Sequence, residues 1–289
     1  MASNISLRQF LRALLKLVRV QNLLIIVFTQ YLARIFLVGP KNEWLSHILD
    51  IHQFFITLST VLIAAAGYII NDYFDIKIDL VNKPQEVIIG RYIRRRWAMI
   101  IHQILNGLGI LIGLFLGLKV LIVNVLAVAC LWFYSSAFKK KAFFGNFMIA
   151  MLTASSLIVM AVYYDKNDNL LNIYALFAFT ITLVREIIKD IEDMRGDARF
   201  GCKTLPIIWG IRKTKRLLFV ILIVFMILTL SIGYSIHNQA INYIFVLMNL
   251  LVGWLFYKIS IADRKIHFTK LSLYCKILMI LGTSSMIFI

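Results

Sequence analysis

Long apolar stretches constrain the fold of this chain more than any other feature of its sequence. A helix rises about 1.5 Å per residue, so about 20 apolar residues are needed to cross the hydrocarbon core of a bilayer. Such runs occur nine times, at residues 20–38, 52–70, 97–116, 118–134, 142–164, 170–187, 217–236, 240–258 and 271–289. Because a segment in lipid must satisfy its own backbone hydrogen bonds, the pattern predicts an all-α membrane protein with nine transmembrane helices.

The composition excludes several other classes of protein. Apolar residues make up 61% of the 289 residues and charged residues only 16%, whereas soluble domains average about 45–50% and about 25%. Three scattered cysteines without a C-x-x-C spacing argue against a disulfide framework or a zinc site. The formal net charge of +17 would suggest nucleic acid binding in a soluble chain. In a membrane protein it indicates basic cytoplasmic loops, so no nucleic acid partner is expected.

The distribution of Lys and Arg predicts the orientation of the chain. If the N-terminus is cytoplasmic, 26 of the 31 Lys and Arg residues lie in cytoplasmic segments and only 3 in outer ones. One missed span would invert every later loop, so this asymmetry supports the count of nine. We therefore predict a cytoplasmic N-terminus and a C-terminus outside. Arg34 and Lys276 fall inside spans near their ends, and we interpret both as snorkelling side chains.

The segment before the first span combines basic and apolar residues. Residues 1–19 carry four basic side chains among apolar residues at helical spacing. This pattern predicts a basic amphipathic helix that lies on the inner leaflet. Residues 20–289 are predicted to form a single nine-helix transmembrane domain.

Nine of the fourteen acidic residues gather in two short stretches that follow the second and sixth spans. Each stretch contains three aspartates at i, i+3 and i+7, a spacing that places them on one face of a helix. The two triads are Asp72, Asp75 and Asp79, and Asp190, Asp193 and Asp197. This repetition is typical of a diverged internal repeat of about four helices. It predicts two acidic faces that converge at the cytoplasmic mouth of a helical bundle.

Such a concentration of carboxylates requires compensation. Like charges repel, and more strongly at the boundary of a low-dielectric membrane. Carboxylates without His or Cys among them suit Mg²⁺, with Mn²⁺ or Ca²⁺ as alternatives. Because Mg²⁺ commonly joins carboxylates to substrate phosphates, the six aspartates predict a Mg²⁺ site for a phosphate or diphosphate. Candidates for charge-assisted contacts with that anion are Lys139, Lys140, Lys189, Arg91 and Arg185.

These motifs resemble those of the UbiA-type intramembrane prenyltransferases. Asn71-Asp72-x-x-Asp75-x-x-x-Asp79 is similar to the first aspartate-rich motif of that family, and Lys189-Asp190-x-x-Asp193-x-x-x-Asp197 to the second. Tyr134-Ser135 followed by Lys139 and Lys140 resembles a weaker third element, and Val18-Arg19-x-x-Asn22 a first-helix signature. The resemblance implies a UbiA-like nine-helix bundle with a lipid-accessible chamber, Mg²⁺ as cofactor and a polyprenyl diphosphate as donor.

The chemistry of the residues agrees with that implication. Loss of diphosphate from an allylic donor creates an anionic leaving group, which metal held by the six aspartates would neutralise. The residues expected to bind substrate are Asn22, Asn71, Arg91, Tyr134, Lys139, Lys140, Arg185 and Lys189. We therefore predict Mg²⁺-dependent transfer of a polyprenyl group to a membrane-associated acceptor, surrounded by membrane lipids. The location expected is a bacterial or archaeal cell membrane, with the active site towards the cytoplasm.

The acceptor and the class of function leave alternatives open. The run 19–24 and the Arg-Glu-x-x-Lys-Asp form of the second motif look most similar to the branch that prenylates geranylgeranylglyceryl phosphate in ether lipid synthesis. The alternative acceptor is an aromatic acid of quinone biosynthesis. A cation-coupled transporter is the rival from another class, because intramembrane acids often mark ion paths. It would place acids near the midplane and break its helices there, whereas these acids lie at the inner ends of spans that contain almost no proline.

Overall fold

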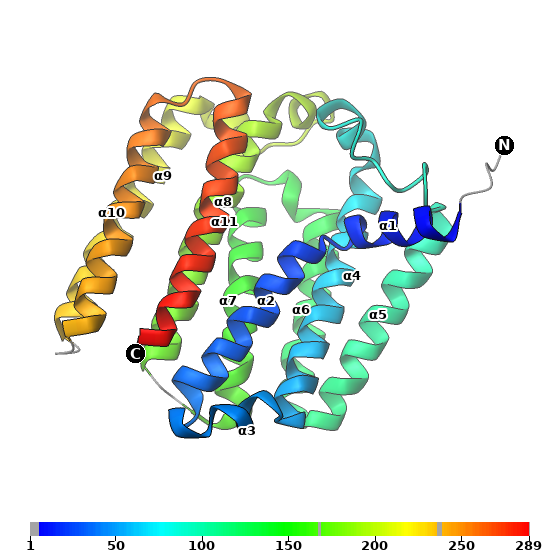
Figure 1. Ribbon diagram of the computed structural model, residues 1–289. Helices are drawn as coiled ribbons and strands as arrows, with labels where there is room; N and C mark the ends of the chain where they lie inside the picture. The colour runs from blue at the N-terminus through cyan, green and yellow to red at the C-terminus, as the bar shows by residue number, and fades with distance from the viewer. Residues whose placement is uncertain (1–5, 167–168, 236–238, 289) are drawn as a thin grey trace.

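The computed structural model describes residues 6–166, 169–235 and 239–288. Within these ranges nine helices are long and apolar enough to cross a membrane, which confirms the predicted all-α architecture. They are α2 (Val20–Ala33, continued by a π-helical turn at Arg34–Val38), α4 (Ile51–Asn82), α5 (Arg95–Leu116), α6 (Leu118–Ser136), α7 (Phe144–Tyr164), α8 (Asn169–Arg199), α9 (Leu205–Ser235), α10 (Gln239–Ile261) and α11 (Lys265–Ser284). Figure 1 shows them packed side by side, with the short helix α3 (Trp44–Ile48) at one end.

The outer faces of the bundle are apolar. Side chains such as Leu118, Leu250 and Phe115 are 70%, 67% and 72% exposed. Such a surface would be an aggregation hazard in water but matches the hydrocarbon of a bilayer. The chain is therefore an integral, multi-pass membrane protein.

Two helices extend well beyond the apolar runs that predicted them. The runs end at residues 70 and 187, but α4 continues to Asn82 and α8 to Arg199. These extensions carry the two aspartate triads, so each triad lies on one face of a continuous helix as predicted. Both extensions reach the end of the bundle opposite α3, at the top of Figure 1.

The seventh span begins earlier than predicted. The apolar run covers 217–236, whereas α9 begins at Leu205 and is kinked at Gly210, whose backbone has φ 76° and ψ 160°. Glycine adopts this conformation without the steric cost that a side chain would bring. The basic residues after the kink belong to the helix and not to a loop.

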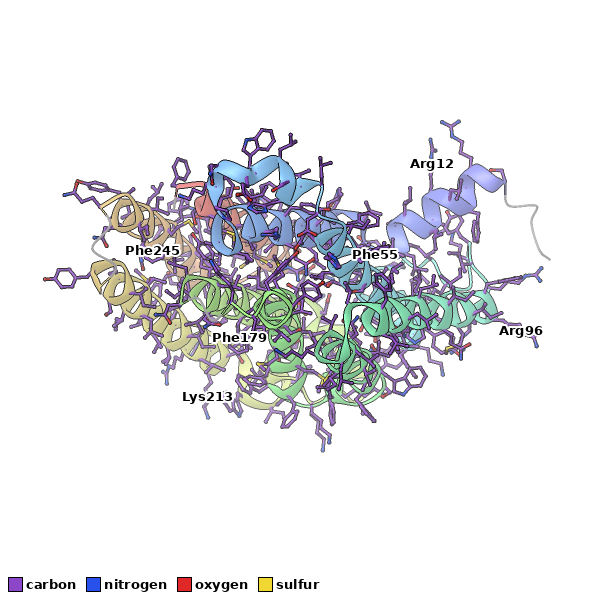
Figure 2. The ribbon with its side chains drawn as sticks, turned by 90° about the horizontal axis from the view of Figure 1, so that it is seen from below. Arg12, Phe55, Arg96, Phe179, Lys213 and Phe245 are labelled. Atoms are coloured by element: carbon purple, nitrogen blue, oxygen red, sulfur yellow. The ribbon has the colours of Figure 1, made fainter. Side chains whose placement is uncertain are left out.

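The predicted amphipathic helix is α1 (Leu7–Leu17), which begins at a capping box between Ser6 and Gln9. Leu17 of α1 is fully buried and belongs to a small core with Ile69 of α4 and Ile89 and Ile93 of the loop after α4. Figure 2 shows α1 at one edge of the bundle with Arg12 pointing away from it. Its location on a membrane surface stays a prediction.

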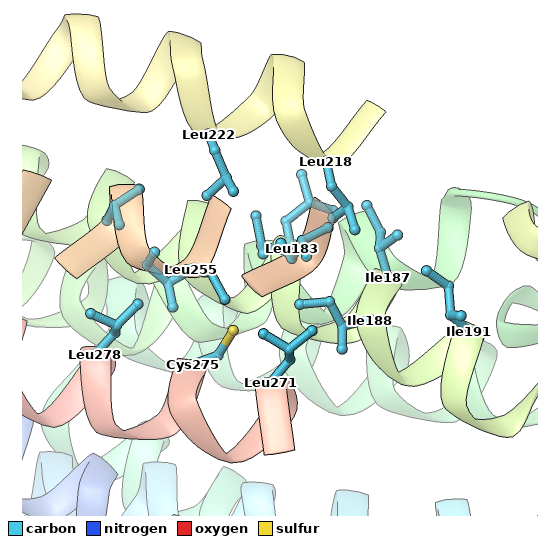
Figure 3. Close-up of a cluster of buried hydrophobic side chains, with 14 of the residues drawn as sticks. Leu183, Ile187, Ile188, Ile191, Leu218, Leu222, Leu255, Leu271, Cys275 and Leu278 are labelled. Atoms are coloured by element: carbon cyan, nitrogen blue, oxygen red, sulfur yellow. The ribbon is translucent and has the colours of Figure 1, made fainter. Parts of the chain in front are cut away.

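The largest core joins the last four helices. Figure 3 shows Ile187 and Ile188 of α8 among side chains of α9, α10 and α11, including Leu218, Leu255 and Leu278. Burying a side chain of this size contributes about 1.5–3 kcal/mol in water. Inside a bilayer the gain comes instead from close packing, because lipid is equally apolar. This core fixes the position of α8 and therefore of the second triad.

Arg34 differs from the interpretation made from the sequence. It does not extend to solvent as a snorkelling side chain would, because its guanidinium donates to Oδ2 of Asp50 at 3.1 and 3.0 Å. The same guanidinium lies 4.4 Å from the ring centroid of Tyr164, whose hydroxyl also donates to Asp50. Burial would raise the pKa of Asp50, but the hydrogen bonds from Tyr164 and Arg34 outweigh it and hold that pKa below its usual value. This cluster fastens the start of α4 to α2 and α7.

Candidate active site

A polar cavity of about 770 Å³ opens where the extensions of α4 and α8 meet. All six predicted aspartates line it, so the structure brings the two triads together from distant parts of the chain. Asp197 of the second triad interacts electrostatically with Asp75 of the first and with Lys139. A cavity of this size lies in the range of about 300–1,000 Å³ that small-molecule sites occupy.

A polar clamp holds the two acidic helices in register. The side-chain amide of Asn82 in α4 donates to the backbone carbonyl of Asp193 in α8 at 3.1 Å and accepts from the backbone N–H of Gly196 at 3.0 Å. A Cβ atom at position 196 would lie 2.4 Å from the Asn82 amide, so only glycine permits this approach. The contact fixes the spacing of the triads at the backbone level.

Basic side chains neutralise several of the carboxylates. Lys139, from the turn between α6 and α7, forms an ion pair with Asp75. Arg19, between α1 and α2, pairs with Asp72 at 2.8 Å, and Lys83, after α4, lies 3.4 Å from both Glu192 and Asp193. These pairs therefore join the aspartates to cations from three different parts of the chain.

The pKa values of two of these cations reflect the pairing. Burial alone would lower the pKa of Arg19, but the nearby charges, led by Asp72, raise it above its ordinary value. Burial would also lower the pKa of Lys83, but the nearby carboxylates of Asp193 and Glu192 outweigh this effect and raise that pKa. Both groups therefore stay protonated throughout the physiological range.

The donor set fits a hard divalent cation. It consists of carboxylate oxygens, and Oδ1 of Asp193 is buried without a hydrogen-bond partner. Asp79 and Asp197 make no side-chain hydrogen bond or ion pair with any residue that the structure describes. In the described part of the chain no three His, Cys, Asp or Glu side chains lie close enough together to form a ready metal cluster, although the six aspartates line one cavity. Lys139, Arg19 and Lys83 pair with Asp75, Asp72 and Asp193. Free carboxylate oxygens of this type are the ligands that Mg²⁺ prefers.

A second cavity, of about 230 Å³, runs from this mouth into the apolar interior of the bundle. Its walls are largely aliphatic, with Ile25, Ile63, Leu131 and Leu152 among them. Eight residues line both cavities and mark the junction between them: Arg19, Asn22, Asn71, Tyr134, Arg185, Glu186, Lys189 and Lys276. A ligand with an anionic head and an apolar chain would match this pair of cavities.

The structure brings most of the predicted substrate-binding residues to these cavities. Asn22, Asn71, Tyr134, Arg185 and Lys189 lie at the junction, and Lys139 lines the polar cavity. Arg91 and Lys140 line neither cavity. The guanidinium of Arg91 lies 5.4 Å from the ring centroid of Tyr92 in the loop before α5, and the backbone carbonyl of Lys140 accepts from the N–H of Lys203 at 2.8 Å.

Several residues of the site were not among those predicted. They are Arg19, Lys83, Asn146, Glu186, Glu192 and Lys276. Asn146 donates to Oδ2 of Asp190 at 2.9 Å, across from α7 to α8. Its position near the end of a span predicts that Lys276 snorkels, but the side chain lines the junction of the two cavities. A basic residue inside a span is a signal for function as well as for snorkelling, and the sequence does not separate the two.

Comparison with known proteins assigns this geometry to a family. Residues 27–280 match the model of the UbiA prenyltransferase family. The chain is 33% identical over 233 residues to the digeranylgeranylglyceryl phosphate synthase of Sulfurisphaera tokodaii, a match that covers 78% of this chain and 81% of that protein.

Two solved structures are similar over nearly the whole chain. One, described as dealing with digeranylgeranylglyceryl phosphate synthase in membranes, is 26% identical with a TM-score of 0.69 and covers 96% of this chain and 98% of its own. The other is a UbiA homolog from Archaeoglobus fulgidus bound to GPP and Mg²⁺. It is 15% identical with a TM-score of 0.67, covers 95% of this chain and 99% of its own, and shares the fold.

Proposed function

The chain belongs to the UbiA prenyltransferase family, and we propose that it transfers a geranylgeranyl group from its diphosphate to geranylgeranylglyceryl phosphate, releasing diphosphate. The observation that carries the proposal is the convergence of two aspartate triads at the mouth of an apolar cavity. The relatives named as digeranylgeranylglyceryl phosphate synthases supply the acceptor. They favour a glycerol phosphate lipid over an aromatic acid, and prenyl transfer over ion transport.

The reaction exchanges one carbon–oxygen bond for another. The allylic carbon of the donor loses its bond to the diphosphate oxygen, which leaves with the electron pair. The free hydroxyl oxygen of the glycerol then forms an ether bond to the same carbon, and its proton passes to the departing diphosphate. An allylic cation develops between these events and must be kept from water.

The aspartates would stabilise the diphosphate leaving group through bound Mg²⁺. Asp72, Asp75 and Asp79 of α4, with Asp190, Asp193 and Asp197 of α8, would hold Mg²⁺ through their carboxylate oxygens. Bound there, Mg²⁺ supplies the positive charge that stabilises a departing diphosphate. The Mg²⁺ in the A. fulgidus structure supports this assignment. Lys139 and Lys83 already lie among these carboxylates and would donate charge-assisted hydrogen bonds to the diphosphate.

Two tyrosines near the junction of the cavities would stabilise the reacting carbon. Tyr68 and Tyr134 line the apolar cavity beside the polar mouth, where the faces of their rings can stabilise an allylic cation. Tyr68 is fixed by a hydrogen bond from Asn22 at 3.1 Å and by the guanidinium of Arg19, 5.0 Å from its ring centroid. The donor's prenyl chain would occupy the apolar cavity, whose aliphatic walls exclude water from the cation.

The active site would face the cytoplasm. The basic residues of the inner loops support this orientation, because the end of the bundle with the acidic mouth also carries most of the Lys and Arg. Water-soluble diphosphate and Mg²⁺ could then exchange directly with the cytosol.

Reconstituted protein tests the proposal directly. Purified protein in lipid nanodiscs is incubated with radiolabelled geranylgeranyl diphosphate and geranylgeranylglyceryl phosphate, with and without Mg²⁺. We expect a labelled diether lipid and an equal amount of diphosphate only when Mg²⁺ and both substrates are present. Labelled product with 4-hydroxybenzoate but none with the glycerol phosphate lipid would refute the acceptor. No product with either acceptor would refute prenyl transfer.

A further inference from the structure

Three basic side chains and one acid form a compact group at the junction of the two cavities. We call this group the cation pocket: Arg185 and Lys189 of α8, Lys276 of α11, and Glu186 of α8. All four residues line both cavities. Lys276 lies within electrostatic reach of the other three. The cation pocket therefore lies between the aspartates and the apolar cavity.

The charges of the cation pocket do not balance. Nη1 of Arg185 lies 2.6 Å from Oε1 of Glu186, and Nζ of Lys189 lies 3.6 Å from Oε2 of the same carboxylate. Lys276 has no ion pair with any residue that the structure describes. Within this group three cations face one carboxylate, which leaves an excess of positive charge in the group. Asp190 and Asp197 of the same helix lie within electrostatic reach of Lys189. By contrast, Lys139, Arg19 and Lys83 each have an aspartate partner.

Burial makes this excess costly. The side chains of Arg185 and Glu186 are only 15% and 10% exposed. Nε of Arg185 is buried without a hydrogen-bond partner, and so is the hydroxyl of Thr182, one helical turn earlier on the same face of α8. A buried donor without a partner costs about 1–3 kcal/mol, more when it is charged. An anion that binds here would satisfy both the charge and the free donors.

We propose that the cation pocket binds the phosphate of the acceptor lipid, an inference that rests on the proposed function. A phosphate monoester carries a charge of about −1.5 to −2 at neutral pH and can pair with several of these cations at once. A single carboxylate of an aromatic acid carries only about half of that charge. The pocket needs no metal, because its own cations supply the charge. The aspartates remain available to the donor diphosphate, so two anionic headgroups can be held side by side.

This placement also orients the acceptor. With its phosphate at the junction, the acceptor's free hydroxyl would lie near Asn71, which lines both cavities and whose Oδ1 has no hydrogen-bond partner. Lys276 is a binding residue in this proposal and takes no part in the bond-breaking step.

The kinetic test compares two substitutions in the same helix. Lys276→Met removes one positive charge from the cation pocket, and Lys270→Met removes one from the exposed part of α11. We expect Lys276→Met to raise the KM for geranylgeranylglyceryl phosphate about 10- to 100-fold, the effect of losing one hydrogen bond to a charged group. The KM for geranylgeranyl diphosphate should stay within about 2-fold, and Lys270→Met should match the wild type. A larger change in donor KM than in acceptor KM would overturn the inference and assign the pocket to the diphosphate.

A binding test removes the reaction altogether. Isothermal titration in EDTA, without donor, compares geranylgeranylglyceryl phosphate, the same lipid without its phosphate, and glycerol phosphate without its chain. We expect the wild type to bind the phosphorylated lipid at least about 10-fold more tightly than the dephosphorylated one, and Lys276→Met to lose this preference. Weak binding of glycerol phosphate alone would show that the chain is also needed, as expected for a lipid headgroup. Equal affinity for the two lipids in the wild type would overturn the proposal.

A further variant tests the same pocket with a substitution that is expected to leave the fold intact. Thr182→Val keeps the shape of the side chain but removes its free hydroxyl, and we expect it to raise the acceptor KM about 3- to 10-fold. Unchanged acceptor KM in both Thr182→Val and Lys276→Met would refute the cation pocket as the phosphate site. If the wild type transferred the prenyl group to an aromatic acid only, the proposed function would fail, and the titration would still report whether the pocket binds a phosphorylated lipid.

Discussion

Replacing Gly196 by alanine tests whether the contact between α4 and α8 holds the two triads together. The new Cβ would lie 2.4 Å from both polar atoms of the Asn82 amide. That amide cannot move away freely, because it donates to the carbonyl of Asp193 at 3.1 Å and accepts from the N–H of Gly196 at 3.0 Å. Relief of the clash therefore breaks two hydrogen bonds, each worth about 1 kcal/mol.

Gly253→Ala is the matched control. Gly253 also lies inside a long helix, and a Cβ there meets nothing within 4 Å. Both substitutions gain the helix preference of alanine, about 1 kcal/mol. That gain cancels in the comparison, so Gly196→Ala should be less stable than Gly253→Ala by about 2 kcal/mol. The displaced Asp193 should also lower prenyl transfer by about 10-fold or more.

The measurements are thermal unfolding of the detergent-solubilised variants, followed by tryptophan fluorescence, and the rate of diphosphate release. The double variant Asn82→Ala with Gly196→Ala completes a cycle. Because Asn82→Ala removes the obstructing amide, adding Gly196→Ala to it should cost almost nothing further. Equal melting temperatures for Gly196→Ala and Gly253→Ala, or strictly additive effects in the cycle, would refute the reasoning.

Three further predictions follow from the site and from the opposite end of the bundle. Asp193→Asn should reduce diphosphate release at least about 100-fold, because it removes a metal ligand. Asp165→Asn is the control and should have no effect, because the pair of Asp165 with Lys119 is exposed on the surface and worth less than about 1 kcal/mol. Equal rates of diphosphate release in the two variants would exclude Asp193 from the site. EDTA should abolish transfer and excess Mg²⁺ should restore it, in an assay of product by thin-layer chromatography; full activity in EDTA would contradict the metal assignment. The lowered folded-state pKa of Asp50 contributes stability that is complete above the ordinary carboxyl pKa and is lost as the pH falls below about 4. The difference in melting temperature between wild type and Asp50→Asn should therefore shrink on acidification, and a constant difference from pH 7 to pH 3 would contradict it.

The sequence predicted the architecture well because hydrophobic length and charge are local properties. Nine apolar runs of about membrane length leave few other folds, and the i, i+3, i+7 spacing needs only a continuous helix to place three aspartates on one face. The same reasoning fails for helix ends. The extensions to Asn82 and Arg199 are polar, so hydropathy gives no signal for them.

The polar partners of the aspartates were harder to predict. Lys83 and Asn82 contact α8 from more than a hundred residues away in the chain, and no local spacing encodes that contact. Arg91 and Lys140 lie close to the motifs in sequence, yet neither lines a cavity, although Ile89 and Lys139 of the same loops do. Lys276 appeared alone in an apolar run, and only the packing of α11 against α8 reveals its neighbours.

The ion pair between Lys139 and Asp75 has a consequence for how the protein is made. The acidic mouth carries its own counter-ions, supplied by side chains from the loops on either side. Assembly of the bundle in the membrane therefore does not have to await an inorganic ion, in contrast to small domains whose folding depends on metal. We expect a newly inserted chain to fold without free Mg²⁺ and to become active once the ion is supplied.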